Sequence, residues 1–264
     1  MKIVVCMKQV PASSKVDIDP ETGAMKRMSG ETRTNPYDLF ALETALQIRE
    51  KVGGTVTVLT MGPPQAEEMM RDAYTMGADD AVILSDRKFA GADVLATSYA
   101  LAQGIQVIGG ADLIICGRQT TDGDTAQVGP QIAEKLDLPQ VTYAGKIEKE
   151  GNVLKIQRLM EDGYMTVEVQ TPCLITCVKE LNVPRYLTVK GILECYDKPI
   201  EVLDYEALKD EPLIDPSTIG LKGSPTNIFR SFTPPQKGAG QMLGGSSEEA
   251  VNELVRQLVK KHVI

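Results

Sequence analysis

The first half of the chain alternates short apolar runs with longer amphipathic stretches, and this alternation restricts the fold more than any other feature. The apolar runs are typical of strands that are covered on both faces of a sheet. The first helix pattern begins with Asn35 as its cap and Pro36 at the first helical position. The expected strands are Lys2–Met7, Thr55–Thr60, Ala81–Leu84 and Asp112–Cys116, and the later helices run from after Pro63-Pro64 to Gly77, from Asp93 to Ile108 and from within Thr125–Pro130. Such βαβ units predict an α/β fold with a mostly parallel, doubly wound, Rossmann-like sheet.

Several segments do not fit the repeating units and predict additions to the sheet. Residues 8–34 are long for a βα connection and contain two short strand patterns, Lys15–Ile18 and Ala24–Met28, around a turn. Later patterns predict an antiparallel hairpin and a returning buried strand, at Val153–Arg158, Met165–Gln170 and Cys173–Val178. We therefore expect residues 1–200 to form one α/β nucleotide-binding domain with a β-hairpin extension.

Residues 201–264 predict an extended arm that ends in a helix. Residues 211–245 hold five Pro and six Gly without a regular spacing, which is typical of irregular chain. Ser246 and Glu249 form a capping-box pattern before an apolar stripe, so a final amphipathic helix should follow. A long arm with such a helix fits contact with a partner subunit, and the alternative is a helix that packs on its own domain.

Charge and histidine content exclude several classes of function. The chain carries 28 Lys and Arg against 36 Asp and Glu, and this acidic balance argues against nucleic-acid binding. The single histidine, His262, excludes a Ser-His-Asp triad and a histidine-rich metal site. The protein therefore takes its chemistry from a bound cofactor or performs none. No apolar run approaches the roughly 20 residues of a membrane span, and the N-terminus lacks a signal-peptide core, so we expect a cytoplasmic protein without a membrane span.

The most unusual polar segment is Gly117–Pro130, which follows a predicted strand and leads into a helix. Its glycines allow close backbone approach, its threonines offer hydroxyls, and backbone N–H groups at a helix start attract phosphate. Asp122 and Asp124 are unusual beside a phosphate, so ribose contacts or internal ordering of the loop fit them better. The strand ends Cys6–Lys8, Met61–Pro63 and Phe89–Asp93 point to the same edge of the sheet. Together these segments predict a crevice for an adenine nucleotide, and a solvated polar loop is the equal alternative for Gly117–Pro130 by itself.

The sequence resembles the β subunits of electron transfer flavoproteins along essentially its whole length. The matching segments are Lys2–Lys8, Asn35–Asp38, Met61–Pro64, Met76–Asp79, Gly117–Pro130, Pro172–Thr176 and Pro184–Tyr186. The resemblance implies a heterodimer with an α subunit and an adenine nucleotide in the predicted crevice. Conventional members hold AMP there as a structural ligand, whereas an electron-bifurcating subset holds a second FAD. Residues 122–130, Phe89–Asp93 and Ser224–Thr226 resemble that subset.

The resemblance to the bifurcating subset implies a specific function. In such proteins NADH gives a hydride to the β-subunit FAD. One electron then goes to ferredoxin or flavodoxin, and the other passes through the α-subunit FAD to a flavin-dependent dehydrogenase of the acyl-CoA or lactate type. The alternatives are a conventional β subunit that holds AMP and a stress-type nucleotide-binding protein of similar topology, which would not need the arm.

The resemblance also implies roles for individual residues. The nucleotide pocket is expected at Cys6, Asn35, Asp38, Met61, Gln119, Thr120, Thr121, Asp122, Gly123, Asp124, Thr125, Ala126, Gln127, Val128, Gly129 and Pro130. The isoalloxazine end is expected at Arg87, Gly91, Ala92, Asp93 and Thr97, and partner docking at Arg185, Tyr186, Leu187 and Val189 in an exposed loop. Val189 stands where the family has an anchoring Leu. The alternative to a docking role is that Val189 is a strand residue packed on its own hairpin. The acidic or amide residue that the family usually carries near Thr166 is missing.

Overall fold

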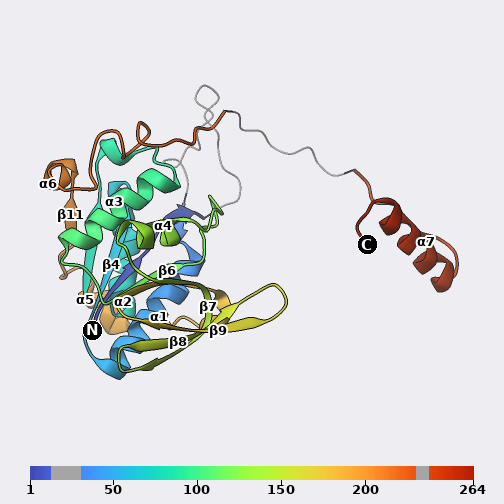
Figure 1. Cartoon of the computed structure of the whole chain (residues 1–264), viewed down its shortest axis with the longest axis horizontal. Coiled ribbons are helices and arrows are strands. Elements are labelled where there is room, and N and C mark those ends of the chain that lie inside the picture. Colours follow the sequence, from blue (N-terminus) through green and yellow to red (C-terminus); the bar gives the residue numbers. More distant parts are fainter. Residues whose placement is uncertain (13–30, 230–237) are drawn as a thin grey trace. The chain divides into compact units, whose positions relative to one another are not determined.

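The computed structural model describes residues 1–12, 31–229 and 238–264, and the main element of these residues is a nine-stranded sheet (Figure 1). The strands lie in the order β11-β5-β4-β1-β6-β10-β7-β8-β9. They are β1 (Lys2–Cys6), β4 (Thr55–Met61), β5 (Asp80–Leu84), β6 (Leu113–Gly117), β7 (Gln140–Glu150), β8 (Val153–Leu159), β9 (Tyr164–Gln170), β10 (Cys173–Cys177) and β11 (Glu201–Leu203). A separate antiparallel pair joins β2 (Gln9–Pro11) to β3 (Thr32–Thr34). The hairpin predicted at Lys15–Ile18 and Ala24–Met28 falls outside the described residues.

The sheet is parallel from β11 to β7 and antiparallel from β7 to β9. This arrangement confirms the mostly parallel α/β sheet, and the β8–β9 pair confirms the predicted hairpin. The sequence pattern did not predict β7. This strand is parallel to β10 at one end and antiparallel to β8 at the other. The outer half of β7 carries alternating charged residues, so it lacks the continuous apolar run of the central strands.

Two layers of helices cover the sheet. The helices are α1 (Pro36–Val52), α2 (Glu67–Met76), α3 (Val94–Val107), α4 (Val128–Lys135), α5 (Val189–Glu194) and α6 (Tyr205–Leu208), with short 3-10 turns at η1 (Pro64–Ala66), η2 (Arg87–Phe89) and η3 (Lys179–Leu181). Helices α1 and α2 bury their apolar sides in one core, and α3 and α4 bury theirs in the other. The sheet is therefore doubly wound, as the sequence predicts.

Strand β1 shows why its apolar run folds between two layers. Ile3 and Val5 are buried in the α1/α2 core, whereas Val4 and Cys6 are buried in the α3/α4 core. Each fully buried aliphatic side chain contributes about 1.5–3 kcal/mol relative to exposure, so a strand with both faces covered needs apolar residues at every position.

The first compact unit continues further along the chain than the sequence led us to expect. It spans Met1–Phe229, and β11 pairs with β5 beyond the expected boundary at residue 200. Leu208, Ile214 and Ile219 are buried in the α3/α4 core, which ties this Pro- and Gly-rich stretch to the sheet domain.

The second unit spans Arg230–Ile264 and contains helix α7 (Ser247–Lys260). The predicted capping box is present, because the Ser246 side chain accepts from the Glu249 N–H and Glu249 accepts from the Ser246 N–H. None of the helices within the described ranges is both long and apolar enough to cross a membrane.

Candidate functional site

The site lies where the direction of winding changes in the sheet. Strands β1 and β6 are parallel neighbours, and Cys6 lies opposite Cys116. The chain leaves β1 toward α1 on one face and leaves β6 toward α4 on the other. Open α/β sheets bind ligands outside the carboxyl ends of their strands at such a switch point. The predicted segments Cys6–Lys8 and Gly117–Pro130 therefore meet at this edge, and Met61 ends the adjacent strand β4.

Asn35 connects the start of α1 to the predicted loop. Its position at the helix N-cap is confirmed, but its side chain does not cap the helix. Instead, Nδ2 donates to the Gln119 carbonyl at 2.8 Å, and Oδ1 accepts from the Thr121 N–H at 3.3 Å. Asn35 is fully buried, so its amide has to find polar partners inside the protein, and the loop backbone supplies them. The prediction that this side chain caps the helix was wrong because the amide bonds to the loop instead. These partners lie 84 and 86 residues away, so no local pattern indicates them.

Asp38 lies one turn further along α1 and is also buried. It accepts from the Lys8 N–H at 2.7 Å. Burial raises the pKa of Asp38 to about 7, although hydrogen bonds from Asn35, Lys8 and Gly117 act in the opposite direction. A Cβ atom on Gly117 would lie 2.3 Å from Asp38 Oδ1, so the close approach of β6 to α1 requires glycine at this position. Asp38 thus links the ends of β1 and β6.

The two carboxylates of the loop are used inside the protein. The Lys8 ammonium lies 2.7 Å from Asp122, whose side chain is only 5% exposed. Asp124 accepts from the Gln119 side chain, and its N–H donates to the Thr120 carbonyl at 3.0 Å. These contacts favour internal ordering of the loop over a freely solvated loop. They also balance or engage the negative charges that would otherwise repel a phosphate.

The loop leaves a run of backbone donors open. Asp124 and Ala126 adopt the left-handed conformation, with φ of 55° and 54°. Within the described ranges, the N–H groups of residues 125–128 have no hydrogen-bond partner, and α4 begins at Val128. Alternating backbone conformations at a helix start turn successive N–H groups toward one concavity, which suits an anion. The backbone present at this edge therefore fits the phosphate groups of a nucleotide.

A second cluster forms at the start of α3. The Asp93 carboxylate caps the helix by accepting from Leu95 and Ala96 at 3.0 Å, and it also accepts from the Thr226 N–H at 3.0 Å. The Asp93 N–H donates to Ser224 Oγ at 2.8 Å. The structure thus brings together Phe89–Asp93 and Ser224–Thr226, two segments that the sequence groups only through the family resemblance.

The other residues predicted for the isoalloxazine end lie on the same two elements. Arg87 begins η2 and is exposed, Thr97 is half-buried on α3, and Gly91 and Ala92 form the turn between them. Among the residues described, no hydrogen bond or ion pair joins this second cluster to Gly117–Pro130. The predicted site therefore consists of two local clusters along one edge of the sheet.

Comparisons with known proteins show the family of the chain. A family model described as "Electron transfer flavoprotein domain" matches residues 22–208. The chain belongs to the electron transfer flavoprotein family. It is 57% identical to the acryloyl-CoA reductase electron transfer subunit gamma of Anaerotignum propionicum over 268 residues. It is 51% identical both to the caffeyl-CoA reductase-Etf complex subunit CarD of Acetobacterium woodii and to an electron transfer flavoprotein subunit beta of Thermoanaerobacterium thermosaccharolyticum. Each of the three alignments covers 100% of both chains.

The chain is thus a β subunit that acts in electron transfer.

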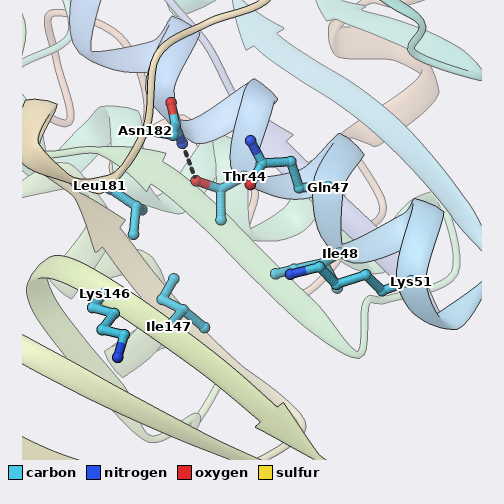
Figure 2. A pocket seen from close by; sticks show the side chains of 8 residues that line it. All are labelled: Thr44, Gln47, Ile48, Lys51, Lys146, Ile147, Leu181 and Asn182. Carbon is cyan, nitrogen blue, oxygen red and sulfur yellow. Dashed lines mark hydrogen bonds between the residues drawn. The ribbon is translucent and has the colours of Figure 1, made fainter.

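One small cavity lies away from the predicted nucleotide edge, which consists of the ends of β1, β4 and β6 together with Gly117–Pro130. It has a volume of about 110 Å³ and lies between α1, β7 and η3 (Figure 2). Its lining consists of Thr44, Gln47, Ile48, Lys51, Lys146, Ile147, Leu181 and Asn182. This volume is too small for a nucleotide, for which ligand pockets of several hundred Å³ are typical.

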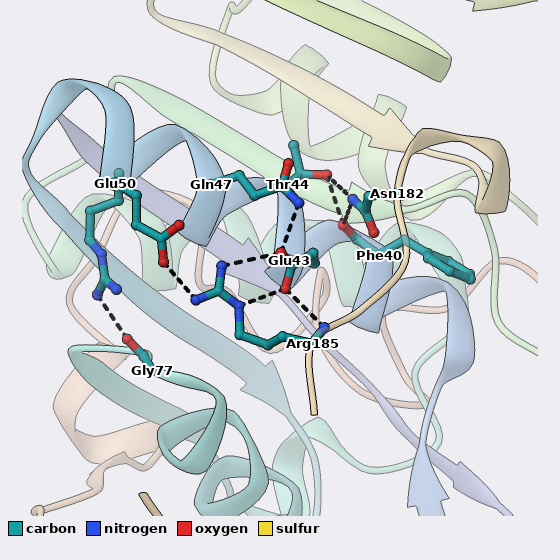
Figure 3. A network of polar contacts seen from close by, with 9 residues as sticks. Phe40, Glu43, Thr44, Gln47, Glu50, Gly77, Asn182 and Arg185 are labelled. Carbon is teal, nitrogen blue, oxygen red and sulfur yellow. Dashed lines mark hydrogen bonds and ion pairs between the residues drawn. The ribbon is translucent and has the colours of Figure 1, made fainter. Parts of the chain in front are cut away.

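The segment predicted to dock a partner is only partly a loop. Tyr186 and Leu187 are exposed in irregular chain, but Val189 begins α5 and is 75% exposed. The alternative of a buried strand residue is therefore wrong for Val189. Arg185 differs from its neighbours, because its guanidinium lies between Glu43 and Glu50 of α1 (Figure 3). Sequence reasoning missed these two glutamates, since no local pattern links them to a residue about 140 positions later.

Proposed function

We propose that this chain is the β subunit of an electron-bifurcating electron transfer flavoprotein, in which it binds FAD and receives electrons from NADH. The observation that carries the proposal is the run of open N–H groups at residues 125–128, at the switch point of the sheet. The cluster of Asp93 with Ser224 and Thr226 supports a longer ligand than AMP, because it offers a second structured position along the same edge.

The residues of this chain would bind and orient the cofactor. The N–H groups of residues 125–128 would hold the pyrophosphate, while Asn35 and Asp38 keep the loop and the two strand ends together. Cys6 and Met61 end strands β1 and β4 at this edge, and the turn at Gly91–Asp93 with Arg87 and Thr97 would receive the isoalloxazine end. When bound, FAD supplies the redox chemistry, which is hydride acceptance from NADH and electron transfer to ferredoxin or flavodoxin and, through the α-subunit FAD, to a dehydrogenase.

The partner dehydrogenase would dock at Tyr186, Leu187 and Val189. Exposed apolar and aromatic side chains on a supported segment are typical anchors for a protein partner. Two of the relatives named above are parts of acryloyl-CoA and caffeyl-CoA reductases. This favours a dehydrogenase of the acyl-CoA type over the lactate type.

The second candidate function is a conventional β subunit with a structural AMP, since the same N–H groups would also hold a single phosphate. Purification of the αβ heterodimer, release of its nucleotides and an anaerobic titration with NADH separate the two. Two FAD per heterodimer and bleaching of the flavin absorbance by NADH are expected. One FAD with one AMP, and no bleaching by NADH, would overturn the proposal in favour of the conventional carrier.

A further inference from the structure

The chain before the docking segment is fixed to α1 by a charged fork. Arg185 donates from Nε to Glu43 Oε2 at 2.8 Å and from Nη2 to Glu43 Oε1 at 3.1 Å, and Nη1 donates to Glu50 at 2.6 Å (Figure 3). The same Glu43 carboxylate accepts from the Arg185 backbone N–H at 3.1 Å. One buried carboxylate therefore fixes both the main chain and the side chain of Arg185, a stronger constraint than a surface ion pair provides.

Neighbouring polar groups hold this fork in place. Gln47 donates to Glu43 at 2.8 Å, and the Glu43 side chain is only 5% exposed. Asn182 donates to the Phe40 carbonyl at 3.0 Å and to Thr44 Oγ1 at 2.8 Å. These acceptors recur three or four residues apart along α1, so they lie on one face of the helix. Residues 182–185 are thus attached to a rigid element at two points.

The other end of the segment is fixed to α2. A Cβ atom on Gly191 would lie 2.5 Å from the Thr75 carbonyl oxygen. The backbone of α5 at Gly191 therefore packs directly against the backbone at the end of α2. Cys195 is buried, and Arg71 of α2 donates to the carbonyls of Cys195 at 2.7 Å and Lys198 at 2.6 Å. Between these attachments Tyr186 is 95% exposed, and Leu187 and Val189 are exposed as well.

We propose that Glu43 and Arg185 are a positioning pair, which holds Tyr186–Val189 in the geometry that docks a flavin-dependent dehydrogenase. The inference rests on the docking role proposed above. Arg185, which the resemblance placed among the docking residues, then acts through the segment that it fixes. A segment held at both ends loses less conformational entropy on binding, and this is the physical gain from the pair.

The test uses the complete αβ heterodimer with its cofactors and a flavin-dependent acyl-CoA dehydrogenase as the acceptor. Rates are measured against dehydrogenase concentration for R185A, R185K, E43Q and V189D, with E148Q as the control. The control removes the same charge from an exposed ion pair, Lys146–Glu148, on β7. Hydrogen exchange of the amides of residues 186–190 reports on the order of the segment.

We expect R185A and E43Q to raise the KM for the dehydrogenase roughly tenfold, with kcat and the rate of flavin reduction by NADH unchanged. The same amides should exchange faster, and R185K should recover part of the loss because it keeps the charge without the fork. E50Q, which removes only the exposed arm of the fork, should fold normally and change the KM about twofold.

Two different results separate the two proposals. If V189D raises the KM while R185A and E43Q leave it unchanged, the positioning pair is wrong and the docking role stands. If V189D itself leaves the KM unchanged, the docking segment is wrong and the positioning role falls with it.

Discussion

The proposed nucleotide edge and the proposed docking segment are held by the same helix in opposite ways. At the start of α1, the buried, uncharged amide of the N-cap residue Asn35 and the Asp38 carboxyl bind backbone groups of the loop after β6 and of Lys8, which follows β1. Further along, α1 uses the Glu43 and Glu50 carboxylates to bind one guanidinium. The first arrangement leaves backbone N–H groups open, and the second leaves apolar side chains exposed. The difference teaches that the two kinds of ligand need different surfaces. A small anion needs backbone N–H groups without hydrogen-bond partners, whereas a protein partner needs exposed apolar side chains.

Each region contains a glycine at which two elements come close together. Gly117 lies against α1 and Gly191 lies against the end of α2, and substitution of the two should have different effects. We expect G117A to show the largest effect, because its Cβ would lie 2.3 Å from Asp38 Oδ1 and 2.7 Å from the Tyr37 backbone. Overpacking against buried backbone should lower the free energy of unfolding by about 3 kcal/mol or more, and bound nucleotide should be lost. Urea unfolding and nucleotide content measure this.

G191A and G163A are the matched substitutions for that experiment. G191A should keep the nucleotide and raise only the KM for the dehydrogenase, because it displaces α5 from α2 at the surface. G163A should change neither property, since Gly163 lies between β8 and β9 and a Cβ there would meet nothing within 4 Å. Equal nucleotide loss in G117A and G163A would contradict the proposed close contact.

The two regions should also respond to pH in opposite directions. Burial raises the pKa of Asp38 from 3.8 to about 7, so between these values the folded state binds a proton that the unfolded state has released. The free energy of unfolding should therefore fall as the pH rises from about 4 to about 7, by roughly 3 kcal/mol. D38N should remove this slope in a series of urea unfolding curves. A wild-type curve that is flat over this range would show that Asp38 is ionised in the folded protein.

The charged fork should lose stability in a different pH range. Burial alone would raise the pKa of Glu43, but the hydrogen bonds from Arg185 and Gln47 bring it below the usual 4.5, and Arg185 lowers the pKa of Glu50. Stability from these groups is complete above pH 4.5 and is lost as the pH falls through their lowered values. E43Q should weaken this acid-side loss and leave the slope between pH 4 and 7 unchanged.

The sequence predicted what depends on local pattern and missed what depends on distant partners. Ile3–Cys6 and the other central strands contain continuous apolar runs, which are typical of a sheet covered on both faces. The partners of Asn35 and Arg185 are more than 80 positions away, so no spacing reveals them. The left-handed backbone at Asp124 and Ala126 was also hidden, because such conformations are predicted from glycine and neither residue is one.

The smallest expected effect concerns the Lys8–Asp122 ion pair, and it tests whether the loop carboxylate serves order or ligand contact. K8M would leave the Asp122 charge beside the proposed pyrophosphate position without its lysine partner, so both loop order and anion binding should weaken. D122N would loosen the loop but remove a charge that repels phosphate, and these two effects oppose each other. We therefore expect K8M to weaken nucleotide retention about fivefold, or about 1 kcal/mol, and D122N to change it less than about twofold.

Equilibrium dialysis at low and high salt measures both, and the K8M effect should shrink at high salt because a half-exposed lysine is screened. The KM for the dehydrogenase should stay unchanged in both variants. If D122N weakens nucleotide retention more than K8M does, Asp122 contacts the ligand itself. The loop carboxylate would then serve ligand binding and not internal charge balance, and the comparison with the exposed docking segment would not hold at this residue.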